Sequence, residues 1–299
     1  MRIDACSAID VASRRPVEAH VVPESKRGEV YLGFGDALAR SSAELVYVST
    51  ENSAHADLVM AALDAGKHVV VDKPSMLDCE QVARGLELAE RRGLCLAEAL
   101  VYPFHPQVAA LRELFAQFQC VPTRVIATLS IPPLPPTSFR YRKTLGGGAL
   151  WDLGPYAVSL GRVIFSDSPL HVHAQVNGVH ASESVDISFS TMESYAEGRA
   201  VVGQFGFDTE YENSLVVLGE KTVARISRFF TTAPDAEAEI MYRAGNAAAV
   251  VRVPAADSFE VFLREVTHSI DRREWARFSQ IMLHDAKALH ALRVRAAEP

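Results

Sequence analysis

Short apolar runs rich in β-branched residues alternate with helical patterns through the first 118 residues. The runs 45–50 (LVYVST) and 68–72 (HVVVD) have the composition of strands that are buried on both faces. Between them, residues 55–65 carry apolar side chains at helical spacing, and Gly66 is placed to end that helix. Two parallel strands need such a crossover. The pattern therefore predicts a βαβ unit.

The flanking segments extend this alternation. Further strands are predicted at 2–9 and 94–100, helices at 11–20 and 79–92, and a short strand–helix unit at 30–39. Alternating strands and helices are typical of a doubly wound parallel sheet, whose ligands bind beyond the carboxyl ends of its strands. We therefore expect the segments after residues 50 and 72 to lie at one mouth, with Pro74 favouring an extended Lys73.

The pattern changes near residue 120, where strands begin to follow each other directly. Helices are predicted only at 149–163, 258–272 and 277–297, and the proline-rich segment 131–136 is predicted as a loop. Successive strands without helices between them favour a largely antiparallel sheet with one packed and one wet face. The predicted fold class is α/β, a Rossmann-like domain at 1–120 and an α+β domain with a large, mainly antiparallel open sheet at 121–299.

Composition excludes several classes of protein. With 299 residues, 48% of them hydrophobic and 22% charged, the chain is long enough for two domains with their own cores. A net charge of −7 argues against a nucleic-acid surface. No apolar stretch approaches the roughly 20 residues that a bilayer span needs, and the N-terminus lacks a secretory pattern. We expect a cytoplasmic protein without membrane or nucleic-acid partners.

Cysteine and histidine spacing gives no metal signature. The four cysteines, Cys6, Cys79, Cys95 and Cys120, lack a CxxC pairing and are predicted to be buried, reduced thiols. His171 and His173 alternate along one predicted strand without a cysteine or acidic partner at metal spacing, which favours positions on the sheet surface. No metal site is expected.

Three segments then occur in an order that resembles a known family. They are 51–74 (ENSAHADLVMAALDAGKHVVVDKP), 98–108 (EALVYPFHPQV) and 139–165 (FRYRKTLGGGALWDLGPYAVSLGRVIF). Together they resemble the glucose-fructose oxidoreductase and inositol dehydrogenase (Gfo/Idh/MocA) family, over residues 2–297. The resemblance implies a Rossmann domain for NAD or NADP and small-molecule substrates such as sugars, inositols or nucleotide-linked sugars. It also implies a homo-oligomer formed through the C-terminal open sheet.

The resemblance assigns a catalytic set. Lys73 matches the family's lysine and would polarise the substrate oxygen or relay its proton, and Asp152 matches an aspartate that binds substrate hydroxyls. The family's histidine is here Tyr156, spaced i, i+4 from Asp152 and so on the same face of a helix. A phenol can donate a proton to a forming alkoxide when an ammonium lowers its pKa from about 10. Alternatively, Tyr156 lines the pocket wall with a satisfied hydroxyl.

Further residues are expected around this set. Thr50, Asn52, His55, Lys73 and Pro74 would border the cofactor, and Asn52 or Ser53 is also suited to capping the helix near residue 55. Tyr102 and His105 follow a predicted strand end and are candidate substrate contacts, with a structural role as the alternative for His105.

Other candidates remain open. Ser7 or Asp10 would face an adenosine ribose or belong to a surface turn. Residues 146–148 (GGG) predict a close backbone approach before the helix that carries Asp152. Arg140 and Arg142 would steer an anionic substrate or lie on the surface.

One family feature has no counterpart. The first Rossmann strand and its GxGxxG turn are missing from this sequence, and the opening strand aligns by pattern with the second. Gly33 and Gly35 lack the spacing and are predicted as a plain loop before a helix. Roughly 25 to 30 residues, one βα unit by usual lengths, are therefore expected to be absent. Either the gene starts further upstream, or the natural protein binds a dinucleotide weakly or not at all. Losing those phosphate contacts would weaken dinucleotide binding by orders of magnitude.

Three functions follow from this. The leading prediction is an NAD(P)-dependent oxidoreductase acting on a carbohydrate-like ketone or secondary alcohol, with Lys73 and Tyr156 as the acid–base pair. The first alternative is a cofactor-independent enzyme on the same scaffold that catalyses proton transfer, elimination, isomerisation or cyclisation. The second is a catalytically silent homologue that dimerises with a full-length relative.

Overall fold

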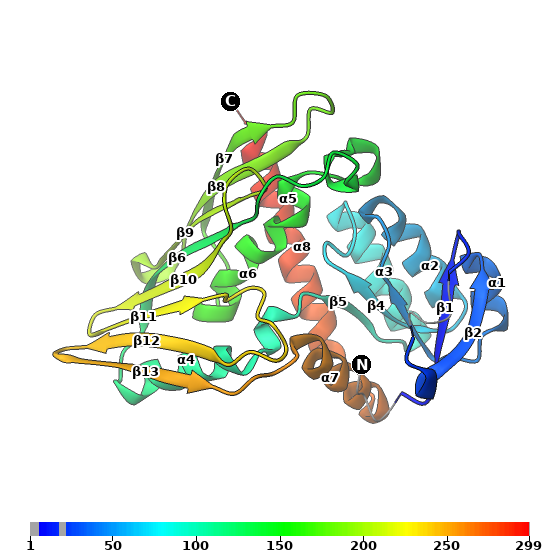
Figure 1. The fold of residues 1–299 in the computed structure, drawn as a ribbon, viewed down its shortest axis with the longest axis horizontal. Helices are drawn as coiled ribbons and strands as arrows, with labels where there is room; N and C mark the ends of the chain where they lie inside the picture. Colours follow the sequence, from blue (N-terminus) through cyan, green and yellow to red (C-terminus); the bar gives the residue numbers. More distant parts are fainter. Residues whose placement is uncertain (1–5, 18–21, 299) are drawn as a thin grey trace. The chain divides into compact units, whose positions relative to one another are not determined.

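A computed structural model describes residues 6–17 and 22–298. The chain forms two compact units, Met1–Ala99 with Phe262–Leu283, and Leu100–Val261 with His284–Pro299. Helices α7 (Ser258–Arg272) and α8 (Ala276–Ala296) each contribute to both units (Figure 1). The domain bounds 1–120 and 121–299 stay a prediction.

The predicted βαβ unit is confirmed in the first unit. β3 (Leu45–Val48), β4 (His68–Asp72) and β5 (Leu96–Ala99) form a three-stranded parallel sheet in that order. α2 (His55–Asp64) and α3 (Cys79–Arg92) connect the strands. Gly66 follows α2 with φ +77°, a conformation that ends the helix at little cost only for glycine. The three central valines of β4 are fully buried, as the apolar run predicts.

The start of the chain differs from the prediction. β1 (Ile9–Ser13) pairs in parallel with β2 (Arg27–Leu32), which leads into α1 (Phe34–Arg40). The helix predicted at 11–20 is wrong for residues 11–13, which belong to β1, while residues 18–20 lie outside the described residues. The strand predicted at 2–9 overlaps β1 only at Ile9, and its residues 2–5 are likewise outside. Pro16 would remove a backbone donor from a helix here, whereas Ile9 and Val11 suit a paired strand.

The parallel strands of the first unit form two separate sheets, β1–β2 and β3-β4-β5. Within residues 6–17 and 22–99, no strand bridges β1 and β3. In the doubly wound order, the first strand lies between the second and the fourth. The break therefore agrees with the alignment of the opening strand to the second Rossmann strand.

One large mixed sheet organises the second unit. Its order is β13-β12-β11-β10-β6-β9-β8-β7, and every neighbouring pair is antiparallel except β6 and β9. The strands are β6 (Pro122–Ser130), β7 (His171–Val179), β8 (Asp186–Ser194), β9 (Ala200–Gly206), β10 (Glu212–Gly219), β11 (Thr222–Ser227), β12 (Ala238–Ala244) and β13 (Ala247–Val253). The mainly antiparallel sheet is thus confirmed, and so is the loop at 131–136.

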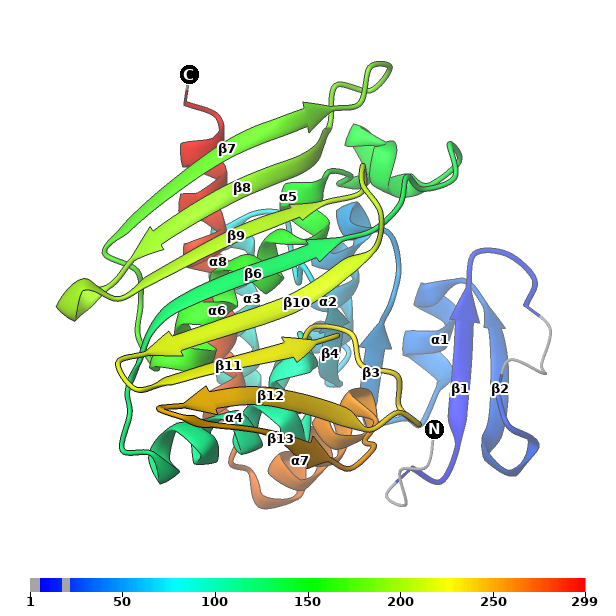
Figure 2. The same cartoon turned by 60° about the vertical axis from the view of Figure 1, so that its left-hand side comes forward.

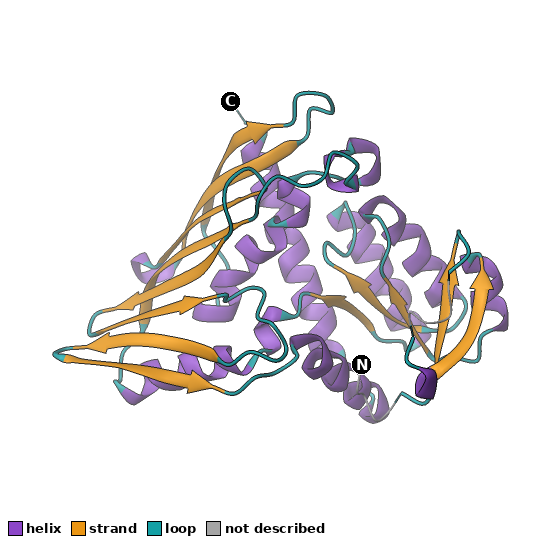
Figure 3. Ribbon diagram, in the orientation of Figure 1, coloured by secondary structure: helices purple, strands orange, loops and turns teal. Residues whose placement is uncertain are grey.

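Helices α4 (Pro106–Gln117) and α6 (Gly154–Phe165) cover one face of this sheet, and Figures 2 and 3 show its other face without a covering helix. On that open face, exposed apolar residues are paired across neighbouring strands in two groups, which the exposed Arg225 of β11 separates. One group is Ile126, Met192 and Val202, and the other is Met241 and Val250. His171 and His173 are exposed on β7, which confirms the predicted sheet-surface positions.

The helix predicted at 149–163 is two helices. α5 (Ala149–Asp152) ends before α6, which begins at Gly154 with Pro155 in its first turn. Proline lacks the donor that a continuous helix would need there, and a side chain at Gly154 would lie 2.6 Å from Leu289 of α8. Asp152 and Tyr156 therefore belong to consecutive helices, so the i, i+4 argument does not apply to them.

Two minor points complete the fold. Cys95 and Cys120 are buried thiols, but Cys6 and Cys79 are half-buried, so the prediction of four buried cysteines is wrong for these two. Burial raises the pKa of the Cys95 thiol to about 12. Across the described parts of the chain, no helix combines the length and apolarity required to cross a bilayer.

Candidate active site

Lys73 follows directly after β4 and is half-buried. The Lys73–Pro74 peptide bond is cis, and Pro74 itself is buried. The residue before the lysine, Asp72, joins β4 to β3: its carboxylate accepts hydrogen bonds from Tyr47 Oη at 2.5 Å and Ser49 Oγ at 2.6 Å. Burial, then the Asp72 charge, raise the pKa of Tyr47, so the phenol stays a donor. The strand end that carries Lys73 is therefore fixed from its neighbour.

His55 holds together two loops of the first unit. Its side chain is 0% exposed; Nδ1 lies 2.9 Å from the carbonyl oxygen of Pro74 and Nε2 3.2 Å from that of Thr50. Both ring nitrogens thus face backbone carbonyls, which favours a structural role over cofactor contact. The segment after β3 and the segment after β4 are thereby connected.

The structure does not place Asn52 or Ser53 at the capping position predicted for them. The N-cap position of α2 is Ala54, without a side-chain cap, so capping by Asn52 or Ser53 is wrong. Asn52 is instead buried in a short 3-10 turn, where the chain turns before α2. Ser75, just after Pro74, donates its backbone N–H to Glu98 Oε1 at 2.6 Å.

The two residues predicted to face an adenosine ribose, Ser7 and Asp10, do not lie after the opening strand as predicted. Because β1 begins at Ile9, Ser7 precedes the strand and Asp10 lies within it, so neither follows its carboxyl end. Asp10 accepts from the backbone N–H of Glu29 at 2.8 Å and from Ser41 Oγ at 2.6 Å, which is a structural role.

In the second unit, the glycine run sets the start of α5. Gly148 has φ +119°, and a Cβ there would lie 2.7 Å from Asp186 Oδ1. A Cβ on Gly147 would lie 2.5 Å from the carbonyl oxygen of Arg140. The predicted close approach is therefore confirmed. Asp186, on β8, accepts the backbone N–H of Leu150 at 2.5 Å, and burial raises the pKa of its carboxyl.

Asp152 ends α5 and is 6% exposed. The Nε atom of Arg140 lies 2.9 Å from its Oδ2. Arg140 lies in a short 3-10 helix, Phe139–Tyr141, before the glycine run, and its pairing with Asp152 is a contact that the sequence did not reveal. Arg142, by contrast, is exposed.

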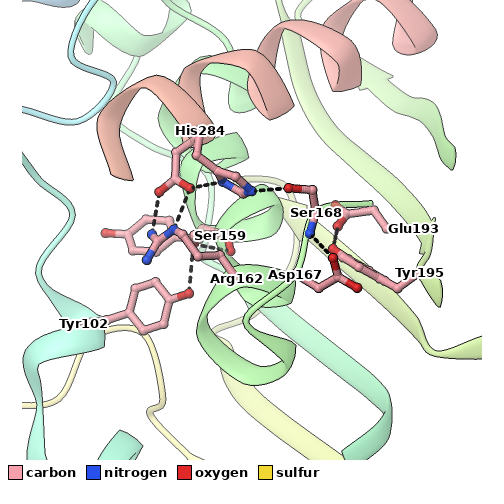
Figure 4. A network of polar contacts seen from close by, with 10 residues as sticks. Tyr102, Ser159, Arg162, Asp167, Ser168, Glu193, Tyr195 and His284 are labelled. Carbon is pink, nitrogen blue, oxygen red and sulfur yellow. Dashed lines mark hydrogen bonds and ion pairs between the residues drawn. The ribbon is translucent and has the colours of Figure 1, made fainter. Parts of the chain in front are cut away.

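Tyr156 lies half-buried in the first turn of α6. Its ring centroid is 6.0 Å from that of Tyr102 and 5.5 Å from that of Phe230. The hydroxyl of Tyr102 lies 2.8 Å from Ser159 Oγ, and Figure 4 shows this pair beside the Arg162 side chain. Tyr102 is 1% exposed, and burial raises the pKa of its hydroxyl.

His105 is the N-cap of α4. Its Nδ1 accepts the backbone N–H of Gln107 at 3.2 Å, and burial lowers the pKa of the imidazole. Like Tyr102, it is buried within the second unit. Contact of these two residues with a substrate stays a prediction, while their packing supports a structural role.

The predicted residues thus form two groups. Thr50, Asn52, His55, Lys73 and Pro74 belong to the first unit, and Tyr102, Asp152 and Tyr156 to the second. Contacts join Thr50 and Pro74 through His55 in the first group, and Tyr102 with Tyr156 in the second. That Lys73 meets Asp152 and Tyr156 in one site stays a prediction.

Sequence reasoning missed the residues that support these groups, Asp72, Asp186 and Ser159. Two had a signal: Asp72 is a polar residue at the end of a buried strand, and Ser159 interrupts the apolar run of α6 three positions after Tyr156. Asp186 is distant in sequence from its partner, so no local pattern could indicate it.

One concavity in the second unit lies apart from the predicted residues. It has a volume of about 580 Å³ between β7 and α8, and its polar lining includes Ser168, His171, His284, Lys287 and Arg295. In the described segments, no group of three or more His, Cys, Asp or Glu residues is arranged for a metal ion.

Comparison with known proteins defines the class of this chain. Residues 4–100 match the "Oxidoreductase family, NAD-binding Rossmann fold" model, and residues 121–225 match the "GFO/IDH/MocA C-terminal domain" model. The chain therefore belongs to the Gfo/Idh/MocA family of oxidoreductases.

Particular relatives are sugar enzymes. The chain is 31% identical to the dTDP-3,4-didehydro-2,6-dideoxy-alpha-D-glucose 3-reductase of Saccharopolyspora spinosa, over 83% of this chain and 75% of that protein. It is 30% identical to the D-xylose 1-dehydrogenase (NADP(+)) 2 of Haloferax volcanii, over 89% of this chain and 85% of that protein. A 3-ketoreductase from Actinomadura kijaniata, solved with NADP and TDP-benzene, superposes with a TM-score of 0.88 at 26% identity, covering 96% of this chain and 89% of that one.

Proposed function

We propose that this chain is an NAD(P)-dependent oxidoreductase that interconverts a ketone and a secondary alcohol on a carbohydrate-like substrate, with a nucleotide-linked sugar as the preferred class. The observation that carries this proposal is the placement of three residues. Asp152 ends α5, Tyr156 lies in the first turn of α6, and Lys73 directly follows β4. The two sugar-nucleotide relatives support the substrate class.

Each residue has a distinct role in this proposal. In the reducing direction, the Tyr156 hydroxyl donates its proton to the oxygen that develops negative charge. The Lys73 ammonium stabilises that charge and the resulting phenolate. Asp152 orients the substrate by accepting hydrogen bonds from its hydroxyls, and Arg140 holds the carboxylate in place. When bound, the nicotinamide supplies or accepts the hydride.

The described residues fit only part of a dinucleotide. The segments that follow β3 and β4 carry Thr50, Asn52, Lys73 and Pro74, which would border the family's cofactor. His55 joins these two segments. Because β1 corresponds to the second Rossmann strand, the described residues assign no contacts to the cofactor's phosphates. Cofactor-independent proton transfer by Lys73, Asp152 and Tyr156 is the second candidate function.

We further propose that the open sheet face pairs with a second copy of the chain. The proposal is supported by the exposed apolar residues of that face, Ile126, Met192 and Val202 on one side of Arg225 and Met241 and Val250 on the other, because exposed apolar patches mark protein interfaces. A cytoplasmic location also remains a prediction.

The test is a turnover assay with the purified chain. dTDP-3,4-didehydro-2,6-dideoxy-α-D-glucose is supplied with NADPH or NADH, and D-xylose with NADP⁺ or NAD⁺, while the absorbance of the reduced cofactor is followed. We expect each molecule of keto sugar to oxidise one molecule of reduced cofactor. We expect this reaction to be faster than the reduction of NADP⁺ or NAD⁺ with D-xylose. If the folded chain neither oxidises NADPH or NADH nor reduces NADP⁺ or NAD⁺, the redox proposal is contradicted. Conversion of the keto sugar by a dialysed sample without nicotinamide would support the second candidate instead.

A further inference from the structure

The ring of Tyr156 lies in an aromatic cluster of the second unit. Tyr102 and Phe230 both contact it, and each also contacts Phe229 at a centroid distance of 5.3 Å. The Tyr156 and Phe230 rings are inclined by 67°, and the Tyr102 and Tyr156 rings by 43°. Tilted and edge-on contacts are the favoured geometries between aromatic rings. The plane of the Tyr156 phenol is therefore constrained from two sides.

The backbone of Tyr156 is held as well. Ser159 Oγ donates a hydrogen bond to the carbonyl oxygen of Tyr156 at 3.2 Å. A serine hydroxyl has one proton, so the bond between Ser159 and Tyr102 must be donated by the Tyr102 hydroxyl. Ser159 is 0% exposed and Tyr102 1%, so water cannot replace either partner. A directed chain of hydrogen bonds thus runs from Tyr102 through Ser159 to Tyr156.

The next turn of α6 is fixed independently. Arg162 lies three residues after Ser159 and pairs with Asp285 of α8 through Nε at 2.8 Å and Nη2 at 2.5 Å (Figure 4). Asp285 also lies 3.0 Å from His284 Nδ1. Because residues three apart share a helix face, Ser159 and Arg162 anchor the side of α6 on which Tyr156 begins the helix. Movement of α6 would break several of these bonds together.

We infer that Tyr102 and Ser159 are positioning residues that fix the orientation of Tyr156 for proton transfer. This inference rests on the proposed function of Tyr156. We place neither side chain against the reacting atoms, because both are buried within the second unit. Their effect is on geometry, and misplacement of a reacting group by about 1 Å can cost a factor of about 100 in rate.

The experiment compares Tyr102→Phe, Ser159→Ala and their double variant with the unchanged chain. Tyr102→Phe keeps the ring in the aromatic cluster and removes only the donor to Ser159. Tyr195→Phe is the matched control: Tyr195 is also buried, its hydroxyl donates to Glu193, and it packs against α6 at Gly161. Its ring contacts Phe165, at the opposite end of α6 from Tyr156. Thermal unfolding of each variant separates loss of structure from loss of position.

The first readout needs no turnover. With ¹³Cζ-labelled tyrosine, the Tyr156 signal is assigned by its loss in Tyr156→Phe, and its chemical shift is compared among the variants at one pH. We expect Tyr102→Phe and Ser159→Ala to move that signal, while Tyr195→Phe leaves it unchanged. An unmoved Tyr156 signal in both variants would overturn the inference, whether or not the chain proves to be a reductase.

The second readout is kinetic, with the keto sugar and reduced cofactor of the turnover assay. We expect kcat to fall about 10-fold in either variant with KM within about two-fold, because the substrate contacts remain and only the proton donor is displaced. The double variant should lose no more than either single one, since both interrupt one chain of bonds. Equal loss in Tyr195→Phe, or additive losses, would contradict a positioning role. Absence of turnover in the unchanged chain would reject the proposed function and leave the spectroscopic result standing on its own.

Discussion

The two units hold their predicted site residues by different means. In the first unit, the His55 ring contacts the backbone carbonyl oxygens of Thr50 and Pro74 and so joins the loops after β3 and β4. The parallel strands of this unit are divided between two sheets. In the second, Asp152 and Tyr156 stand on helices packed against one continuous eight-stranded sheet, and side chains such as Arg140, Asp186 and Ser159 support them.

This difference indicates which part of the chemistry is anchored more completely. The groups proposed to donate a proton and orient a substrate have several buried supports in the second unit. The groups proposed to border a nucleotide have fewer, and they stand beside a break in the parallel sheet. Substitutions that act on one unit at a time can therefore test whether both contribute to one site.

The largest effect is expected from the proposed acid–base pair, which takes one residue from each unit. Lys73→Met should lower kcat/KM by about 1,000-fold and Tyr156→Phe by about 100-fold, within the range that general acid–base groups contribute. Steady-state kinetics with the keto sugar and NADPH measures both. Lys67→Met is the control, since Lys67 belongs to the same unit and its ammonium donates to the carbonyl oxygen of Ser41. Retained activity in Lys73→Met would show that the first unit supplies no proton-transfer group.

A second effect concerns the pH dependence of stability in the second unit. Glu193 is 0% exposed, its carboxyl accepts from Tyr195, and burial raises its pKa from 4.5 to about 7. The folded chain thus holds this proton more tightly than the unfolded chain. The contribution of Glu193 to the free energy of unfolding is therefore fully present at low pH. It is lost as the pH rises from about 4.5 through about 7, by on the order of 3 kcal/mol.

Glu193→Gln removes this titration while keeping an acceptor for Tyr195. Urea unfolding between pH 5 and pH 8 should show a flatter profile for the variant, which gains stability relative to the unchanged chain at the alkaline end. Glu220→Gln, at an exposed position, serves as the matched control and should keep the original slope. Identical slopes in all three proteins would contradict a buried, proton-binding Glu193.

The third effect compares one glycine from each unit. Gly148→Ala should lower the free energy of unfolding by about 3 kcal/mol, because it combines a positive φ with a Cβ 2.7 Å from Asp186. Gly66→Ala also has a positive φ but no atom within 4 Å of the new Cβ, so about 1 kcal/mol is expected. Equal losses measured by chemical denaturation would mean that the contact with Asp186 carries no cost.

Local patterns predicted much of this fold because their signals lie within single segments. The buried run of β4 and the stop at Gly66 identified the βαβ unit, and the change near residue 120 identified the mixed sheet. The separation of α5 from α6 was missed because the sequence does not show whether Pro155 begins a new helix or lies within a longer one. The close approach of Gly154 to Leu289 of α8 is a tertiary contact that no local pattern specifies.

The candidate site was less accessible from sequence. Lys73, Asp152 and Tyr156 were found through family-like segments, but what holds them depends on contacts between distant residues. Asp186 reaches α5 from β8, and Tyr102 reaches Ser159 across 57 positions. Such contacts follow from the tertiary fold, and no local pattern specifies them.

The most direct test of a nicotinamide-dependent role is calorimetric titration of the purified, folded chain with NADPH and with NADH. We predict saturable binding of at least one of them below millimolar concentration, weakened by Lys73→Met and unchanged by Lys67→Met. No binding of either cofactor at millimolar concentration, with circular dichroism showing an intact fold, would contradict the account.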